Sequence, residues 1–300
     1  MSAKTSIEWT DRTWNPVRGC SVVSAGCKNC YAMHVAARFS GPGQAYEGLA
    51  LRSPARWTGG IKLVEKNLFA PLSWRKPQRV FVNSMGDLFH ELLADEEIDR
   101  VFAVMAMAQR HTFQVLTKRP ERMRAYVHGA AARLDRHIAL YWGTGHGVPW
   151  PLDNVWLGTS VEDQRTADER IPHLISVPAA VRFLSCEPLL GPLDLRTHLG
   201  IVQNHDDLMG LVDWVIVGGE SGADARPMKT AWARQIIGQC RQAGAAPFVK
   251  QLGQRPVWSE APEDFLHGFI GARALRDPKG GDPVEWPADL RVREFPEGVR

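Results

Sequence analysis

Three of the chain's five cysteines lie within eleven residues, in the stretch CSVVSAGCKNC. Cys20, Cys27 and Cys30 have the spacing C-x6-C-x2-C. Three thiols cannot all pair with one another as disulfides, whereas one metal centre can use all of them. Two thiolates that bracket a two-residue turn are typical ligands of one metal, and the loop before them can deliver a third. The spacing therefore predicts a metal site formed by these three cysteines.

Two kinds of metal centre fit three cysteines. A [4Fe–4S] cluster held by three thiolates leaves one iron open for a further ligand. Zinc takes four ligands, and His34 follows Cys30 by four residues on the same face of an expected helix. The spacing leaves iron and zinc open. Of the two remaining cysteines, Cys240 lies within a helical pattern and Cys186 ends an apolar run.

The composition is that of a folded chain without extreme charge. Hydrophobic residues make up 44% of the 300 residues, and 36 basic residues face 33 acidic ones. A net charge of +3 means that electrostatic recognition has to be local. We find no apolar run of signal-peptide or membrane-span length, and clustered cysteines do not resemble a secreted disulfide framework. We therefore expect a cytoplasmic protein with no membrane association.

Short apolar runs rich in Val, Ile and Phe alternate with helical patterns along the chain. This alternation is typical of a parallel sheet covered by helices on both faces. It predicts an α/β fold, a partial or full (β/α) barrel of six to seven parallel strands, with a doubly wound open sheet as the competing topology. The expected strands lie in residues 5–9, 79–86, 112–118, 154–160, 181–188, 213–221 and 246–253, with helices over 95–110 and 230–244.

The barrel is expected to occupy residues 1–253, with the cysteines in its N-terminal loop. Residues 40–60 interrupt the alternation and are expected to form a loop or lid. From residue 254 onward the chain is rich in Pro, Gly and Trp. It also keeps apolar residues such as Trp286, Leu290 and Phe295, so residues 254–300 are expected to form an ordered appendage packed on the barrel.

Each apolar run ends in polar or small residues. In a (β/α) barrel the carboxyl ends of the strands meet at one rim, where such enzymes build their sites. Turns and helix caps explain glycines and serines there, but they explain poorly charged residues that directly follow buried strands. We therefore expect a site at this rim. The candidates are Ser84, Asp87, Lys118, Arg119, Ser160, Glu162, Glu187, Gly218, Gly219, Glu220 and Lys250.

Cysteines between a first strand and a first helix are placed as in radical S-adenosylmethionine enzymes. The chain resembles a phage- and bacteria-associated three-cysteine family of unknown function that is similar to those enzymes. The matching stretches are IEWTDRTWNPVRGCSVVSAGCKNCYA, VFVNSMGDLFH, VLTKRP, LGTSVE, FLSCEPLLGP, VIVGGESG, FVKQLG and KGGDPVEWPADLRVREFP. The superfamily's usual spacing is C-x3-C-x2-C with an aromatic before the last cysteine. Here the first gap is six, and Asn29 precedes Cys30.

The resemblance implies a [4Fe–4S] cluster on Cys20, Cys27 and Cys30 that cleaves S-adenosylmethionine with an electron from a donor. It assigns further residues by the chemistry of the cofactor: Ser84 and Asp87 to its ammonium, Lys118 or Arg119 to its carboxylate, Ser160 and Glu162 to its ribose, and Gly218, Gly219 and Glu220 to a motif similar to the superfamily's Gly-Gly-Glu. The 5′-deoxyadenosyl radical so formed would modify or repair a substrate.

The substrate and the chemistry at the rim rest on fewer residues. Glu187, Glu220 and Lys250 are the candidate catalytic residues. The phage association of the family that the chain resembles favours a nucleotide or nucleic acid as substrate by analogy. Aromatic and basic residues near the expected mouth could stack on and neutralise such a ligand: Tyr31, Trp74, Phe89, Arg52, Arg56, Lys118 and Arg119. One alternative is a non-catalytic adaptor with a Cys3His zinc site. A second is a hydrolase or transferase that uses Glu187 and Glu220 as acid and base.

Overall fold

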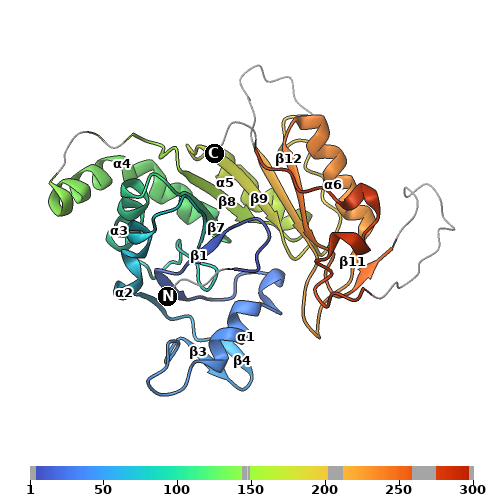
Figure 1. Ribbon diagram of the computed structural model, residues 1–300, viewed down its shortest axis with the longest axis horizontal. Helices are drawn as coiled ribbons and strands as arrows, with labels where there is room; N and C mark the ends of the chain where they lie inside the picture. The colour runs from blue at the N-terminus through green and yellow to red at the C-terminus, as the bar shows by residue number, and fades with distance from the viewer. Residues whose placement is uncertain (1–4, 144–146, 148, 202–211, 259–274, 297–300) are drawn as a thin grey trace. The chain divides into compact units, whose positions relative to one another are not determined.

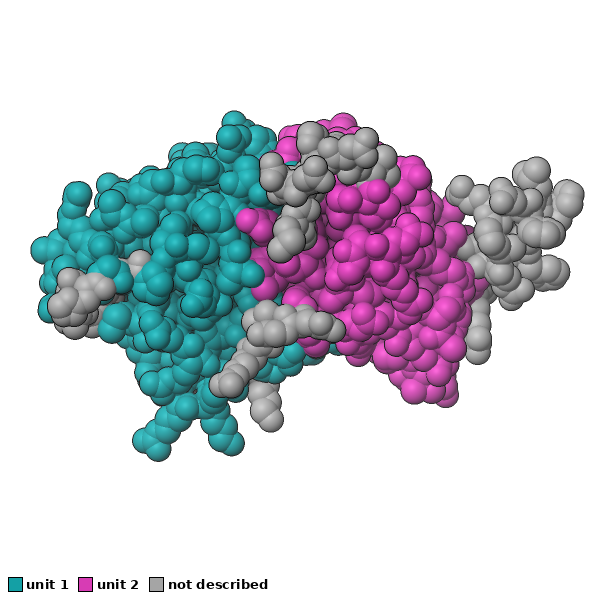
Figure 2. All heavy atoms as spheres, turned by 90° about the horizontal axis from the view of Figure 1, so that it is seen from above, with its two compact units in different colours: residues 1–159, 173–180 teal, residues 160–172, 181–300 magenta. Residues whose placement is uncertain are grey.

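The computed structural model describes residues 5–143, 147, 149–201, 212–258 and 275–296 (Figure 1). The chain divides into two compact units, which Figure 2 colours separately. Unit 1 contains residues 1–159 and 173–180, and unit 2 contains residues 160–172 and 181–300. The three clustered cysteines therefore belong to unit 1, whereas the predicted site residues from Ser160 onward belong to unit 2.

Seven parallel strands form the main sheet, and their order in the sheet follows their order in the chain. A doubly wound sheet would reverse direction at a switch point, so sequential order identifies the singly wound barrel topology. Among the described residues the sheet ends at its first and seventh strands, which makes the barrel partial and confirms the predicted fold class. The strands are β1 (Arg12–Trp14), β6 (Arg79–Val82), β7 (Thr112–Thr117), β8 (Val155–Ser160), β9 (Val181–Cys186), β10 (Trp214–Gly218) and β12 (Ala246–Gln251).

The central strands are buried on both faces. Every residue of β8 and of β10 is buried, which explains why these strands are continuous apolar runs and do not alternate with polar residues. The helices are α3 (Asp95–Met107), α4 (Pro120–Trp142), α5 (Gln164–Ile175) and α6 (Thr230–Ala243). Three acidic residues in the first turn of α3 suit the helix dipole, and α6 ends at Gly244, whose φ of 74° is left-handed.

The N-terminal segment of unit 1 carries short elements between β1 and β6. Strand β2 (Val17–Gly19) pairs antiparallel with β5 (Ile61–Leu63), and β3 (Ala50–Arg52) pairs antiparallel with β4 (Ala55–Trp57). The expected lid over residues 40–60 thus contains a hairpin. Helix α1 (Tyr31–Arg38) follows the 3-10 turn η1 (Ala25–Cys27), and α2 (Glu65–Leu68) and η2 (Ala70–Ser73) lead into β6.

The prediction of a first strand at residues 5–9 is wrong. Residues 8 and 9 lie in a turn in which the Thr10 amide donates to the Ile7 carbonyl, and the first strand begins at Arg12. Trp9 is nevertheless 2% exposed, and its ring centroid lies 4.7 Å from that of Phe81. The apolar residues of this stretch therefore cover the end of β6 from a turn, a burial that periodicity cannot distinguish from a strand.

The described part of the C-terminal segment packs along β12 in unit 2. The Val249 amide donates to the Val292 carbonyl, and the Trp214 indole donates to the Glu294 carbonyl. Trp286 is 2% exposed. Short elements complete this segment: β11 (Met228–Lys229) paired with β13 (Pro256–Val257), η3 (Pro283–Glu285) and η4 (Ala288–Leu290). Residues 259–274 and 297–300 of the expected appendage lie outside the described residues.

No helix in the described ranges combines the length and apolarity that a membrane crossing requires.

Candidate metal centre

The cysteines occupy a loop between β2 and α1. Cys20 directly follows β2, Cys27 ends η1, and Cys30 is the N-cap residue of α1. The Cys30 amide donates to the Cys27 carbonyl at 3.3 Å, which closes the two-residue turn between them. All three are free, partly buried thiols. The predicted turn-bracketing arrangement of Cys27 and Cys30 is therefore present.

The three thiols are close enough to interact electrostatically. Burial raises the pKa of Cys20 to about 12, with further raising contributions from Asp87 and Cys27 and an opposing one from Arg119. Burial also raises the pKa of Cys30, and Cys27 adds to that shift. The Cys27 thiol contributes to the pKa shift of each of the other two thiols. As free thiols Cys20 and Cys30 are protonated at neutral pH, so a metal has to displace protons to bind.

Positive and polar groups around the thiols oppose these shifts. The amides of Ala32 and Met33, in the first turn of α1, donate toward Cys30 and lower its pKa, and Lys118 lowers it further through its charge. Nη1 of Arg119 lies 4.0 Å from Sγ of Cys20. Hydrogen-bond donors and cations at this spot stabilise thiolates, which is what metal ligation by cysteine requires.

Arg119 is the hub of this region. Its side chain is only 9% exposed, and its nitrogens donate to Asp87 Oδ2 at 3.0 Å, Glu91 Oε2 at 2.7 Å and Ser21 Oγ at 2.6 Å. Burial works against its charge, but the charges of Asp87, Cys20 and Glu91 outweigh that effect and raise its pKa. The guanidinium thus joins the end of β7, the loop after β6 and the cysteine loop.

Asp87 fastens the loop after β6. Its carboxylate accepts hydrogen bonds from the Phe89 amide (3.0 Å), the Thr117 hydroxyl (2.7 Å), the Lys118 amide (3.2 Å) and Arg119 Nη1 (3.0 Å). Four donors saturate the carboxylate, so its role in this structure is to hold the loop in place. This differs from the ligand-binding role assigned by chemistry alone.

Phe89 anchors the same loop by packing against aromatic side chains of two helices. It is fully buried, and its ring centroid lies 5.8 Å from that of Tyr126 on α4 and 6.4 Å from that of Phe102 on α3. The expectation that Phe89 stacks on a substrate is therefore wrong, because a fully buried ring has no free face. Trp74 is engaged too, since the Arg12 guanidinium lies 4.6 Å from its ring centroid. Tyr31 is 53% exposed.

Ser84 connects two neighbouring segments. Its hydroxyl donates to Asn15 Oδ1 at 3.2 Å, and its carbonyl accepts the Tyr31 hydroxyl at 2.7 Å. The second contact ties the start of α1, and with it Cys30, to the loop after β6. Unit 1 thus brings together the predicted residues Ser84, Asp87, Lys118 and Arg119 with Cys20, Cys27 and Cys30.

Sequence reasoning missed a second set of residues beside Cys20. The Leu92 amide donates to His90 Nδ1, so in the neutral tautomer Nε2 carries the proton and donates to Ser21 Oγ at 3.1 Å. Burial, then the charge of Arg119, lowers the pKa of His90. Partial burial of Glu91 opposes its ionisation, yet its own backbone amide and Arg119 lower its pKa to about 2. Both residues follow Asp87 within four positions of the sequence.

The predicted residues of unit 2 form separate ion pairs. Glu187 Oε1 lies 2.9 Å from Lys250 Nζ, with side-chain exposures of 15% and 20%. The two glycines after β10 make room for their neighbours: a Cβ on Gly218 would lie 2.2 Å from Glu187 Oε1, and one on Gly219 would lie 2.3 Å from the Leu252 carbonyl oxygen. Close packing thus accounts for the Gly-Gly pair.

Glu220 and Glu162 are each held by an arginine. Glu220 accepts Arg226 Nη2 at 2.6 Å and Nε at 2.9 Å, and these hydrogen bonds, followed by the charge of Glu220, raise the pKa of Arg226. Glu162 is fully buried and accepts Arg170 Nη1 at 2.9 Å, while the same nitrogen donates to the Ser160 carbonyl at 2.8 Å. These contacts support the strand ends, and no ligand is needed to explain them.

Cys186 and Cys240 belong to the core of unit 2. Burial raises the pKa of Cys186 well above its ordinary value, and Cys240 of α6 contributes to the shift. The Ser185 hydroxyl, by contrast, donates to Glu187 Oε2 at 3.3 Å. Cys186 therefore faces the helix, while Ser185 and Glu187 share the opposite face, as period-two alternation predicts.

The fit of the cysteine region to a metal rests on its donor set. In the described ranges, no three His, Cys, Asp or Glu side chains are arranged as ligands of a single ion. Three adjacent thiols with amide donors and a guanidinium beside them suit a thiolate-bound cluster, which is larger than one ion and carries negative charge. His34, the candidate fourth ligand of zinc, is exposed and lines a hollow with Arg52 and Ala55 of the hairpin.

Comparisons place the chain among proteins without an assigned activity. Neither curated proteins nor solved structures give a match. The profile of one family covers residues 4–269, which is nearly the whole chain. The chain therefore belongs to the family described as "Protein of unknown function (DUF5131)".

Proposed function

We propose that the protein is an iron–sulfur enzyme in which Cys20, Cys27 and Cys30 hold a [4Fe–4S] cluster for radical chemistry with S-adenosylmethionine. The observation that carries the proposal is the meeting of three thiols with the amide end of α1 and the Arg119 guanidinium. A cluster held by these residues would supply one electron to the sulfonium of S-adenosylmethionine, with release of methionine and a 5′-deoxyadenosyl radical.

The surrounding side chains have distinct tasks in this proposal. Arg119 offsets the negative charge of the Cys20 thiolate, and its contacts with Asp87 and Glu91 fix its position. Since Arg119 already serves these acceptors, we assign Lys118, whose charge acts on Cys30, to the carboxylate of S-adenosylmethionine. An electron donor is required as a partner, and a reducing cytoplasm would keep the thiols available.

In unit 2, the Glu187–Lys250 pair is our candidate for proton transfer or substrate contact. Both side chains are partly exposed, and a carboxylate beside an ammonium can exchange a proton with a bound group. Glu220 is held by three donors of Arg226, so we assign it a positioning role. The Glu162 side chain is fully buried and paired with Arg170, so of the two ribose candidates we keep only Ser160.

Anaerobic reconstitution with iron and sulfide tests the proposal. The wild-type protein should bind about four irons per chain and convert S-adenosylmethionine to 5′-deoxyadenosine in the presence of a reductant. Cys20→Ala, Cys27→Ala and Cys30→Ala should each lose the iron. Stoichiometric zinc without iron after reconstitution would refute the proposal.

His34→Ala separates the cluster from a zinc adaptor. A Cys3His site would lose a quarter of its ligands, and the variant would then release metal as readily as a cysteine variant. The cluster proposal expects unchanged iron content, because the His34 side chain lines the hollow beside the hairpin. A hydrolase or transferase would instead show activity that does not depend on S-adenosylmethionine.

A further inference from the structure

Positive charge is concentrated in the segment that carries the cysteines. Between Arg12 and Val64 the sequence has seven Lys or Arg residues and a single acidic residue, Glu47. This segment therefore has an excess of six positive charges, whereas the whole chain has a net charge of only +3. The remainder is net negative, so an approaching polyanion is attracted to this part of unit 1.

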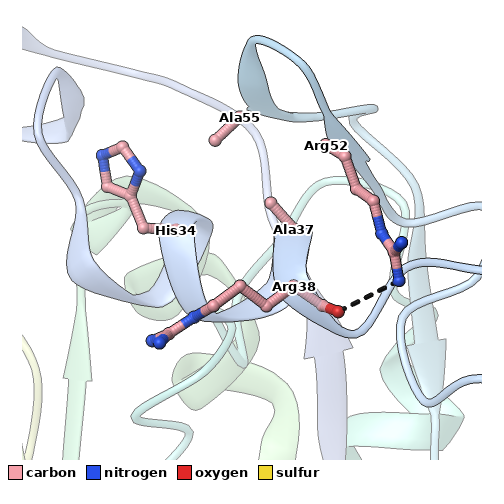
Figure 3. A pocket seen from close by; sticks show the side chains of 5 residues that line it. All are labelled: His34, Ala37, Arg38, Arg52 and Ala55. Carbon is pink, nitrogen blue, oxygen red and sulfur yellow. Dashed lines mark hydrogen bonds between the residues drawn. The ribbon is translucent and has the colours of Figure 1, made fainter.

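A hollow of about 490 Å³ lies within this segment, between α1 and the β3–β4 hairpin (Figure 3). His34, Ala37 and Arg38 line it from the helix, and Arg52 and Ala55 line it from the hairpin. Figure 3 shows the Arg52 guanidinium bonded to the Arg38 carbonyl, at 3.2 Å, while the His34 ring and the Arg38 side chain extend from the same helix. The two alanines are small and leave the space open.

Basic and aromatic groups are presented to solvent along one stripe of α1. Tyr31, His34 and Arg38 are spaced i, i+3 and i+7, so they lie on one helix face, and all three are exposed. Within the described ranges, the His34 imidazole and the Arg38 guanidinium have no hydrogen-bond or ion-pair partner. The Tyr31 hydroxyl donates to the Ser84 carbonyl, which holds the half-exposed ring in place.

Exposed apolar side chains are also concentrated in the same segment. Of the ten large hydrophobic side chains that are exposed in the described ranges, five lie between residues 22 and 51. Exposed apolar groups interleaved with unpaired cations are typical of surfaces that hold nucleobases and phosphates together. These five residues are Val22, Val23, Tyr31, Phe39 and Leu51.

We propose that this stripe and hollow bind single-stranded nucleic acid. A backbone phosphate contacts the Arg38 guanidinium, and a base stacks on Tyr31. An unpaired strand is favoured over a duplex because stacking on a side chain requires a base that is free of its neighbours. The inference rests on the proposed function in one respect, because it names the class of substrate on which the enzyme would act. The binding of the strand itself does not require the cluster.

Fluorescence anisotropy with a labelled oligothymidylate of about 20 nucleotides, longer than a typical single-strand site, tests the inference. Arg38→Gln should weaken binding at least about fivefold and reduce the salt dependence by the equivalent of about one phosphate contact. Tyr31→Ala should weaken binding about five- to tenfold through lost stacking, whereas Tyr31→Phe keeps the ring and should bind like the wild type. Arg241→Gln, an exposed arginine of α6, is the matched control and should change nothing.

Circular dichroism should show that each variant is folded, and the binding measurement should be made with and without reconstituted iron. If neither Arg38→Gln nor Tyr31→Ala changed the affinity for the oligonucleotide, the proposed location of the binding site would be wrong. Thymidine monophosphate could also displace the labelled probe at the same concentration as the unlabelled oligonucleotide does. That result would show that the site binds a free nucleotide and would overturn the proposed binding of a strand. Iron binding and S-adenosylmethionine cleavage without oligonucleotide binding would overturn this inference alone. Oligonucleotide binding by a protein that takes up no iron on anaerobic reconstitution would overturn the proposed function alone.

Discussion

Nη1 of Arg119 lies 4.0 Å from Sγ of Cys20, although the two residues are 99 positions apart in the sequence. The same atom lies 3.0 Å from Asp87 Oδ2. One buried guanidinium therefore links the end of β7 to the first cysteine of the loop. Any change at Arg119 should affect both the stability of unit 1 and the electrostatic environment of the thiols.

Replacing Arg119 by methionine should lower the free energy of unfolding by about 3–5 kcal/mol, because the nearly buried Asp87 carboxylate loses its partner. Arg119→Lys should recover only part of this, since an ammonium cannot reach three acceptors with the same geometry. Urea denaturation measures both. Arg165→Gln, which breaks an exposed pair with Glu169, is the control and should cost less than about 1 kcal/mol. Equal losses of unfolding free energy in Arg119→Met and in the control would show that the contacts of Arg119 stabilise the protein no more than an exposed ion pair does.

The contacts of Arg119 also show what could not be predicted from the sequence. The strand-end pattern predicted that Asp87 and Arg119 lie at one edge of the sheet, because carboxyl ends of parallel strands meet there. It could not predict that they bind each other, because a long arginine side chain can point to solvent, to a ligand or to a neighbouring loop. That choice depends on the distance between two loops, which only the folded sheet fixes.

Gly218 should not tolerate a side chain. A Cβ there would lie 2.2 Å from Glu187 Oε1, so Gly218→Ala has to push the carboxylate away from Lys250 and should cost about 1–3 kcal/mol. Gly238→Ala is the control, because nothing lies within 4 Å of its Cβ on α6, and it should stabilise by up to about 1 kcal/mol. Thermal or urea unfolding compares the two. A neutral Gly218→Ala would mean that Glu187 moves at no cost.

The order of the long strands could be predicted from the sequence more reliably than the positions of the short elements. Six of the seven main strands were found because a strand buried on both faces is a continuous apolar run, as β8 and β10 are. The first strand was displaced because Trp9 is buried from a turn, and β1 itself is only three residues long. A strand of that length has no periodicity to detect, and its pairing with β6 decides its existence.

Stability should fall at alkaline pH through Cys240. Burial raises the pKa of this thiol from 9.0 to about 12, and the charge of Glu294 adds to the shift. Below pH 9 the thiol is protonated in both the folded and the unfolded state. Above pH 9 the unfolded state loses the proton first, so the folded state loses stability, by about 2 kcal/mol between pH 9 and about pH 10.5. Urea unfolding at several pH values measures this loss.

Cys240→Ala isolates that contribution. The variant should be less stable than the wild type at pH 8 because it leaves a small cavity, and the gap should narrow as the pH rises. Other groups titrate in this range in both proteins, so the difference between the two curves carries the information. A gap that stays constant up to about pH 10.5 would contradict the raised pKa of the buried thiol.

Cys186 should not be a metal ligand, although it ends a strand at the predicted rim. It is fully buried against Cys240 of α6, on the face of β9 opposite to Ser185 and Glu187. Cys186→Ala should therefore leave iron content and S-adenosylmethionine binding unchanged. Glu187→Gln should instead lower turnover about tenfold, because it removes the charge that holds Lys250 at 2.9 Å. Glu169→Gln, an exposed change on α5, should do neither. Iron lost from Cys186→Ala would mean that a fourth thiolate closes the cluster, and a closed cluster has no iron left for S-adenosylmethionine.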